Sequence, residues 1–209
     1  MNKLIWAIGF IFISALGFSQ EYTKISNSKA LEQKIIATNS AASTLQASFT
    51  QEKHMSILNK PFVSTGKFYY KNPDKMRWEY MVPFSYIVVL KNNKVSIKDG
   101  DDLQNYDMSN NAIFKEINNT MGGMMSGKML EDENFSKSFY ESKNAYKVVL
   151  LPNSDKIKSF IEEIHLFLNK ETLLINSVEM LENGGDKTVI LFENIKQNSP
   201  INEVVFDKI

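Results

Sequence analysis

Most of the chain is a succession of short segments in which apolar and polar residues alternate, the pattern of strands that bury one face. In the first of them Leu45, Ala47 and Phe49 alternate with polar neighbours. Turn residues, such as those at Asn72–Asp74, separate the segments. Because short turns join antiparallel neighbours, the pattern predicts a meander of antiparallel strands.

The turns divide the chain into roughly eleven expected strands. The best-defined ones span residues 45–50, 62–70, 76–80, 86–90, 95–98, 135–140, 146–151, 160–168, 173–181 and 188–195. Some later strands are apolar on both faces. In one of them Ile164 and Leu166 lie on one face and Phe167 lies on the other. Such strands need cover on two sides. No long linker and no fixed-period repeat appears, so a single domain is expected.

Helical spacing occurs in two places. Over residues 28–43, Ser28 is placed to cap a helix whose apolar face carries Leu31, Ile35 and Ala42. Between Asn111 and Met129, apolar residues recur every four positions. A large antiparallel sheet has to close, pack on another sheet, or have its apolar concave face covered. The sequence therefore predicts a strongly curved antiparallel sheet, mainly β with α, whose concave face the two helices cover.

The second predicted helix is rich in methionine and glycine. Four of the ten methionines (Met121, Met124, Met125 and Met129) fall within nine residues and alternate with three glycines. Methionine fills irregular core gaps, so an ordinary core helix is one interpretation. Glycine weakens a helix interior, by about 0.5–1 kcal/mol against alanine. The other interpretation is therefore a mobile lid that opens over an apolar ligand.

The N-terminus has the pattern of a secretory signal peptide. Lys3 precedes an apolar run from Leu4 to Leu16, and small residues follow at Gly17 and Ser19. A membrane span needs about 20 apolar residues, which is longer than this run. We therefore expect residues 1–19 to be removed, residues 20–209 to form the working domain, and the protein to be periplasmic without stable membrane insertion.

Composition excludes several classes of function. The 24 basic and 24 acidic side chains balance, so no net charge favours nucleic acid. Cysteine is absent and there are only two histidines, His54 and His165, which lie far apart in the sequence. We therefore expect no thiol chemistry, no metal site, no cofactor and no catalytic residues, so the protein is not expected to be an enzyme.

A known family resembles this arrangement. After the first helix come Phe49 and Gln51 as a Phe-x-Gln motif, then Gly66 and Phe68 as Gly-x-Phe, and finally Arg-Trp-Glu-Tyr over 77–80. This combination resembles the periplasmic outer-membrane lipoprotein carrier family (LolA-like), and the order of elements agrees over essentially the whole mature chain. The resemblance implies an open, incomplete antiparallel β-barrel with a helical lid, in a single domain that is mainly β with α.

The resemblance also implies a function and partners. Such proteins carry acyl chains of lipoproteins from an inner-membrane release complex to an outer-membrane acceptor, and a monomer is expected. The residues expected to line the cavity and lid are Phe49, Phe68, Tyr70, Met76, Trp78, Tyr80, Ile113, Ile117, Met121, Met124 and Met125. Two alternatives stay open, namely an exported carrier of another lipid or glycolipid and a non-enzymatic envelope scaffold.

One position departs from the family pattern. Members of the family have arginine before the motif proline, as a latch for the lid, whereas this chain has Asn72 before Pro73. Asparagine has fewer donors and no charge. Asn72 and Arg77 are therefore the candidate latch residues, and the latch is expected to be weaker or differently built.

Overall fold

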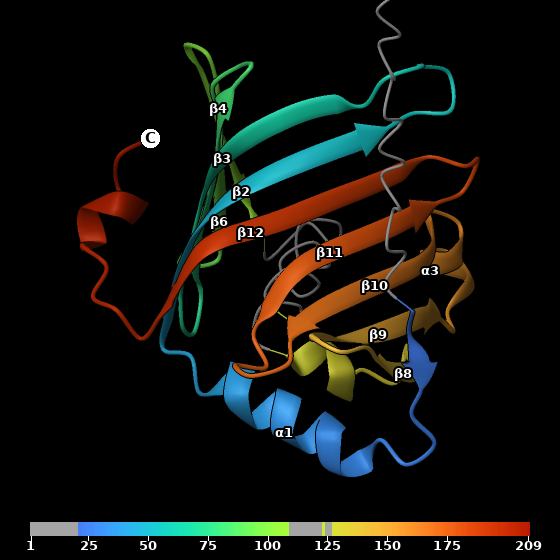
Figure 1. Cartoon of the computed structure of the whole chain (residues 1–209). Helices are drawn as coiled ribbons and strands as arrows, with labels where there is room; N and C mark the ends of the chain where they lie inside the picture. Colours follow the sequence, from blue (N-terminus) through green and yellow to red (C-terminus); the bar gives the residue numbers. More distant parts are fainter. Residues whose placement is uncertain (1–20, 109–122, 124–126) are drawn as a thin grey trace, which may run out of the picture.

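The computed structural model describes residues 21–108, 123 and 127–209. Its strands form one twelve-stranded antiparallel sheet in the order β1-β8-β9-β10-β11-β12-β2-β3-β4-β5-β6-β7 (Figure 1). Within the described residues β1 and β7 are the two edge strands and do not pair with each other. The sheet is therefore open and does not close into a barrel. The predicted incomplete barrel is confirmed.

The elements follow the chain in a simple order. They are β1 (Thr23–Lys24), α1 (Lys29–Ser40), β2 (Thr44–His54), β3 (Phe62–Lys71), β4 (Lys75–Val82), β5 (Tyr86–Lys91), β6 (Lys94–Asp99) and β7 (Asp102–Asp107). After them come η2 (Lys128–Glu131), β8 (Phe135–Glu141), β9 (Ala145–Pro152), α3 (Asp155–Lys158), β10 (Ile161–Asn169), β11 (Ile175–Glu182), β12 (Lys187–Gln197) and η3 (Glu203–Phe206). None of the described helices is long and apolar enough to span a membrane.

Sequence patterns located ten strands, and the structure adds β1 and β7. Both are edge strands whose pairing comes from backbone hydrogen bonds to one neighbour, so an apolar face is not required of them. The expected strand at 173–181 begins later, at Ile175, because Leu173 adopts a left-handed turn conformation with φ 57°. The segment between β9 and β10, which the sequence analysis places outside the strands, forms the short helix α3.

Helix α1 closes one end of the curved sheet (Figure 1). It is shorter than predicted, and Ser28 is its N-cap residue without a capping hydrogen bond from its side chain. Ile35 is fully buried, and the buried amide of Asn39 donates to the carbonyl oxygens of Ile35, at 2.8 Å, and of Leu173, at 3.0 Å. The bond to Leu173 ties α1 to the β10–β11 turn.

The 3-10 helix η2 packs closely against α1. Gly127 has φ 71°, and a Cβ there would lie 3.2 Å from the Cβ of Asn39, so glycine permits the close approach. An ion pair of 2.8 Å between Lys137 and Glu32 joins β8 to α1. The predicted helix at 111–129 falls outside the described residues except for Gly123 and 127–129, and its last two residues belong to the 3-10 helix η2.

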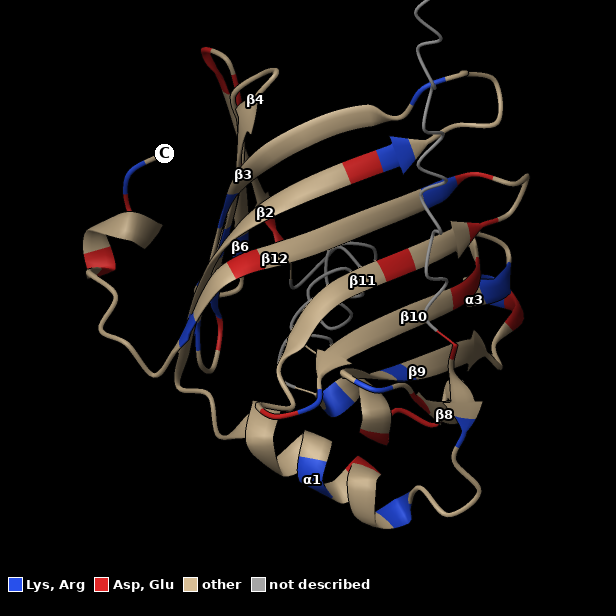
Figure 2. Cartoon of the chain, in the orientation of Figure 1, with Lys and Arg blue, Asp and Glu red and all other residues tan. Residues whose placement is uncertain are grey.

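The sheet has two different faces. The inner face carries the main core, including the fully buried Phe68, Val148 and Ile164. Charged residues of both signs are interspersed along the strands (Figure 2). Burial on the inner face supplies most of the apolar contact that stabilises the domain.

The C-terminal segment, residues 200–209, packs on the outer face of β4 and β5. Phe206 is buried there together with Ile87 and Val89. Glu203 forms ion pairs with Lys71 and, at 2.8 Å, with Lys75. The segment is therefore fixed by a small apolar core and by charge pairs around it.

The ion pairs of Glu203 make this attachment sensitive to acid. Lys71 and Lys75 lower the pKa of Glu203 from its ordinary value of 4.5 to about 2. A lowered carboxyl pKa stabilises the folded state above pH 4.5, and the contribution is lost as the pH falls toward 2. We expect the protection factors of the amides in residues 203–206, which correct the exchange rates for the intrinsic effect of pH, to fall over this interval.

The Glu203→Gln variant is the control for this prediction. Its C-terminal segment should exchange faster than the wild type at neutral pH, and the difference should disappear near pH 2. A constant difference between the two proteins from pH 2 to pH 7 would contradict the role of the Glu203 charge.

Candidate functional site

The inner face of β2, β3 and β4 carries a cluster of aromatic side chains. The ring of Phe49 lies 4.6 Å from that of Trp78 and 5.2 Å from that of Tyr80. Phe68 lies 5.1 Å from Trp78. These four predicted residues meet because the register pairs Phe68 with Trp78, and Phe49 and Tyr80 each with Gly66. The cluster is a continuous apolar floor.

Tyr70 and Met76 extend this floor toward α1. They are paired across β3 and β4, and both are buried. Burial, followed by the charge of Asp74, raises the pKa of Tyr70. All six sheet residues expected at the site therefore lie on the inner face. The other five, Ile113, Ile117, Met121, Met124 and Met125, lie outside the described residues.

Three neighbouring residues were not predicted as part of the site. Phe192 on β12 lies 6.0 Å from Trp78, and Ile190 precedes it on the same face. Gln51 follows Phe49 on the inner face of β2 and accepts a hydrogen bond of 3.0 Å from the Tyr80 hydroxyl. The alternation along residues 188–195 and the Phe-x-Gln motif were signals that could have identified them.

At the end of the sheet opposite α1, which we call the mouth, the inner face becomes polar. Lys53 forms an ion pair of 2.5 Å with Glu182, and the Thr188 hydroxyl donates to the same carboxylate at 2.9 Å. Ser64 is also buried here. Large apolar side chains are exposed at the same end, among them Ile57 (86% exposed), Phe84 (72%) and Phe160 (70%). The mouth thus combines polar side chains on the inner face with a rim of exposed apolar side chains.

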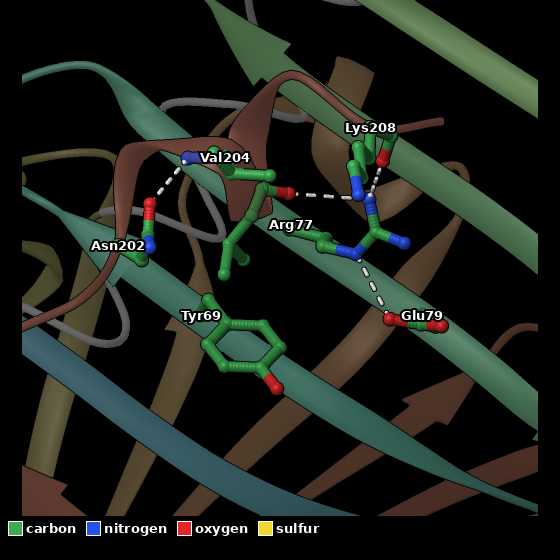
Figure 3. A pocket seen from close by; sticks show the side chains of 7 residues that line it. Tyr69, Arg77, Glu79, Asn202, Val204 and Lys208 are labelled. Atoms are coloured by element: carbon green, nitrogen blue, oxygen red, sulfur yellow. Dashed lines mark hydrogen bonds and ion pairs between the residues drawn. The ribbon is translucent and has the colours of Figure 1, made fainter.

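A hollow of about 280 Å³ lies on the outer face under the C-terminal segment (Figure 3). The buried side chain of Arg77 occupies its centre and donates to Glu79 at 2.9 Å. Arg77 also donates to the carbonyl oxygens of Val205, at 3.2 Å, and Lys208, at 2.5 Å. Its hydrogen bonds attach the C-terminal segment to the sheet.

The two candidate latch residues lie in different surroundings. Arg77 contacts the C-terminal segment, on the face opposite Trp78. Asn72 is exposed in the β3–β4 turn, where its backbone N–H donates to the carbonyl of Ser43 at 2.9 Å. A latch role for either residue stays a prediction.

The two histidines contact glutamates separately on the outer face. His165 contacts Glu163 at 2.7 Å and Glu179 at 3.5 Å, whereas His54 contacts Glu52 at 3.1 Å. Among residues 21–108, 123 and 127–209, no three histidine or carboxylate side chains come together as a metal site.

Comparisons with known proteins agree with this geometry. The family profile described as "Outer membrane lipoprotein carrier protein LolA" matches residues 40–208. The outer-membrane lipoprotein carrier protein of Methylococcus capsulatus is 26% identical over 167 residues, which cover 79% of this chain and 77% of that protein. The protein of the same name from Pseudomonas paraeruginosa is 24% identical over 197 residues, covering 94% and 91%.

A solved structure resembles the fold as well. An uncharacterized conserved protein from Thermus thermophilus superposes with a TM-score of 0.53 at 11% identity, covering 85% of this chain and 93% of that one. At this identity the likeness shows the fold alone.

Proposed function

Because the chain belongs to the outer-membrane lipoprotein carrier family, we propose that it is a periplasmic carrier that binds the acyl chains of lipoproteins. The observation that carries the proposal is the apolar floor from Tyr70 to Tyr80 on the inner face of an open sheet. An acyl chain is flexible and apolar, and such a surface can contact it along its length. The carrier acts without catalysis, metal or cofactor, as a monomer.

The energetics of an acyl chain require direct transfer between proteins. Burying each methylene contributes about 0.8 kcal/mol, so a chain of roughly 15 methylenes contributes on the order of 12 kcal/mol. Spontaneous release into water would be far too slow at that affinity. We propose that an inner-membrane release complex loads the carrier and an outer-membrane acceptor unloads it. The exposed Ile57, Phe84 and Phe160 supply an apolar rim for this contact at the mouth.

Three sequence features complete the proposal. Residues 1–19 direct export and are then cleaved, which N-terminal sequencing of the purified protein would test. From the sequence we further propose that Ile113, Ile117, Met121, Met124 and Met125 serve as an adaptable apolar lid over the ligand. Asn72 is the proposed latch residue for that lid, since Arg77 is already bound to the C-terminal segment.

Native mass spectrometry of the protein purified from its own periplasm tests the proposed cargo. A lipoprotein carrier should retain a lipoprotein or its acylated N-terminal part. Bound glycolipid or phospholipid would instead favour the exported lipid carrier, and a ligand-free protein that captures only other proteins would favour a scaffold.

The methionines of the proposed lid lead to a separate prediction. Replacing Met121 and Met125 together by Asp should abolish binding of a fluorescent fatty-acyl probe, because two charges would have to be buried against the chain. Fluorescence titration would measure the affinity. The matched control replaces Leu151 and Leu191, which are 41% and 44% exposed on the outer face, by Asp. That control should bind the probe as the wild type does, and equal binding by all three proteins would exclude the lid from the site.

A further inference from the structure

The inner face changes character along the strands. On β2, the apolar Ala47 and Phe49 are followed on the same face by Gln51 and then Lys53. On β12, the buried Ile190 lies one step from the polar Thr188. An amphiphilic ligand on this face would therefore place its hydrocarbon toward α1 and its polar end toward the mouth. The boundary between the two zones lies at Trp78 and Tyr80, next to Phe49.

Trp78 carries an unpaired donor at this boundary. Its side chain is 4% exposed, and its indole N–H makes no hydrogen bond in the described part of the chain. The surrounding rings of Phe49, Phe68 and Phe192 offer it no strong acceptor. A buried N–H without a partner is unfavourable and is rare in folded proteins. An acceptor supplied by a ligand would satisfy it.

A polar pair lies beside this donor. The Tyr80 hydroxyl donates to the side-chain oxygen of Gln51 at 3.0 Å. Burial raises the pKa of Tyr80, so the hydroxyl stays protonated at neutral pH, although Trp78 and Gln51 partly oppose the rise.

We propose that Trp78 and the Tyr80–Gln51 pair form a binding site for the carbonyl group that joins an acyl chain to its polar headgroup. The indole N–H donates to the carbonyl oxygen, and the polar pair contacts the linkage on the side of the mouth. This inference rests on the proposed function and adds a position and orientation for the ligand.

The chemistry of the surroundings selects this ligand group. The indole nitrogen only donates, so the ligand atom must be an acceptor. The aromatic rings around it disfavour a charged group, which would lose its hydration without a counter-charge. Lys53, which lies on the same face toward the mouth, is already paired with Glu182. An ester or amide carbonyl is an uncharged acceptor attached directly to hydrocarbon, and it meets each of these requirements.

Matched lipid probes test the proposal on the mature protein. Monopalmitoylglycerol and the ether hexadecylglycerol have the same headgroup and nearly the same chain, but only the ester has a carbonyl. We expect the ester to bind about tenfold more tightly, which corresponds to about 1.4 kcal/mol. N-palmitoylethanolamine tests an amide carbonyl in the same way. The linkage whose probe binds more tightly than the ether identifies the carbonyl group that the site prefers.

The single tryptophan of the mature chain provides a direct readout. Since Trp6 lies in the expected signal peptide, Trp78 gives the only indole N–H signal in the NMR spectrum. The ester should shift this signal downfield, as a new hydrogen bond does, and the ether should not. This measurement needs no variant, so it stays decisive if a Trp78 substitution fails to fold.

Substitutions then test which residues cause the preference for the ester over the ether. Trp78→Phe should reduce the ester-to-ether ratio to about one, and Tyr80→Phe should reduce it in part. Tyr69→Phe removes the same hydroxyl from the outer face and should leave the ratio unchanged. Equal affinity of the wild type for ester and ether, with no indole shift, would overturn the carbonyl site but leave the carrier function intact. If neither probe binds, the proposed function itself fails, and the carbonyl site fails with it.

Discussion

Replacing Gly66 by Ala is expected to lower the free energy of unfolding by about 3 kcal/mol, at the upper end of the range for overpacked sites. A Cβ at this position would lie 1.9 Å from the carbonyl oxygen of Glu79 and 2.7 Å from the ring of Phe49. The first of these atoms is backbone in a neighbouring strand, so it cannot rotate away. Denaturant unfolding followed by circular dichroism would measure the loss.

Gly100 offers the matched control. It lies in the β6–β7 turn with φ 56°, and no atom lies within 4 Å of a Cβ built there. Gly100→Ala should therefore cost only the backbone strain of a left-handed residue, about 1 kcal/mol. If both variants lost the same stability, the close approach of β3 and β4 at Gly66 would not be the cause.

Replacing Phe206 by Ala is expected to release the C-terminal segment from the outer face. Phe206 is 3% exposed and forms the centre of the small core with Ile87 and Val89. Removing a buried phenylalanine ring costs about 3 kcal/mol or more. Limited proteolysis should cleave the variant within residues 200–209 while the sheet stays intact.

Two comparisons make this test specific. Val204→Ala changes a residue of the same segment that is 45% exposed, and it should leave the proteolysis rate close to that of the wild type. Binding of an acyl probe should survive in Phe206→Ala, because the segment lies on the face opposite Trp78. Loss of probe binding together with the segment would contradict the separation of the two faces.

Local sequence patterns identified most of the strands. Side-chain direction in a strand has a period of two, so the alternation at Leu45, Ala47 and Phe49 marks a buried face without reference to any partner. Phe68, Trp78 and Tyr80 were expected at the cavity through the family resemblance, not through this alternation. Turn residues located the hairpins, because their backbone preferences are also local.

Local sequence patterns predicted the polar part of the candidate site less completely. Gln51 was noticed as part of a motif, but its hydrogen bond to Tyr80 depends on the pairing of β2 with β3 and of β3 with β4. The ion pair of Lys53 with Glu182 joins residues that are 129 positions apart. Such contacts follow from register across several strands, and the sequence of one strand does not contain them.

Sequence alone therefore determined that this chain forms an antiparallel sheet with one apolar face, because alternation and turn chemistry act within a few residues. Only the tertiary structure decided what each face contacts. Arg77, a candidate latch in the sequence, lies under the C-terminal segment because the outer face of β4 packs against residues 128 and 131 positions later. The edge strand β7 likewise depends on its neighbour β6, whose backbone groups bind a segment that lacks an apolar pattern of its own.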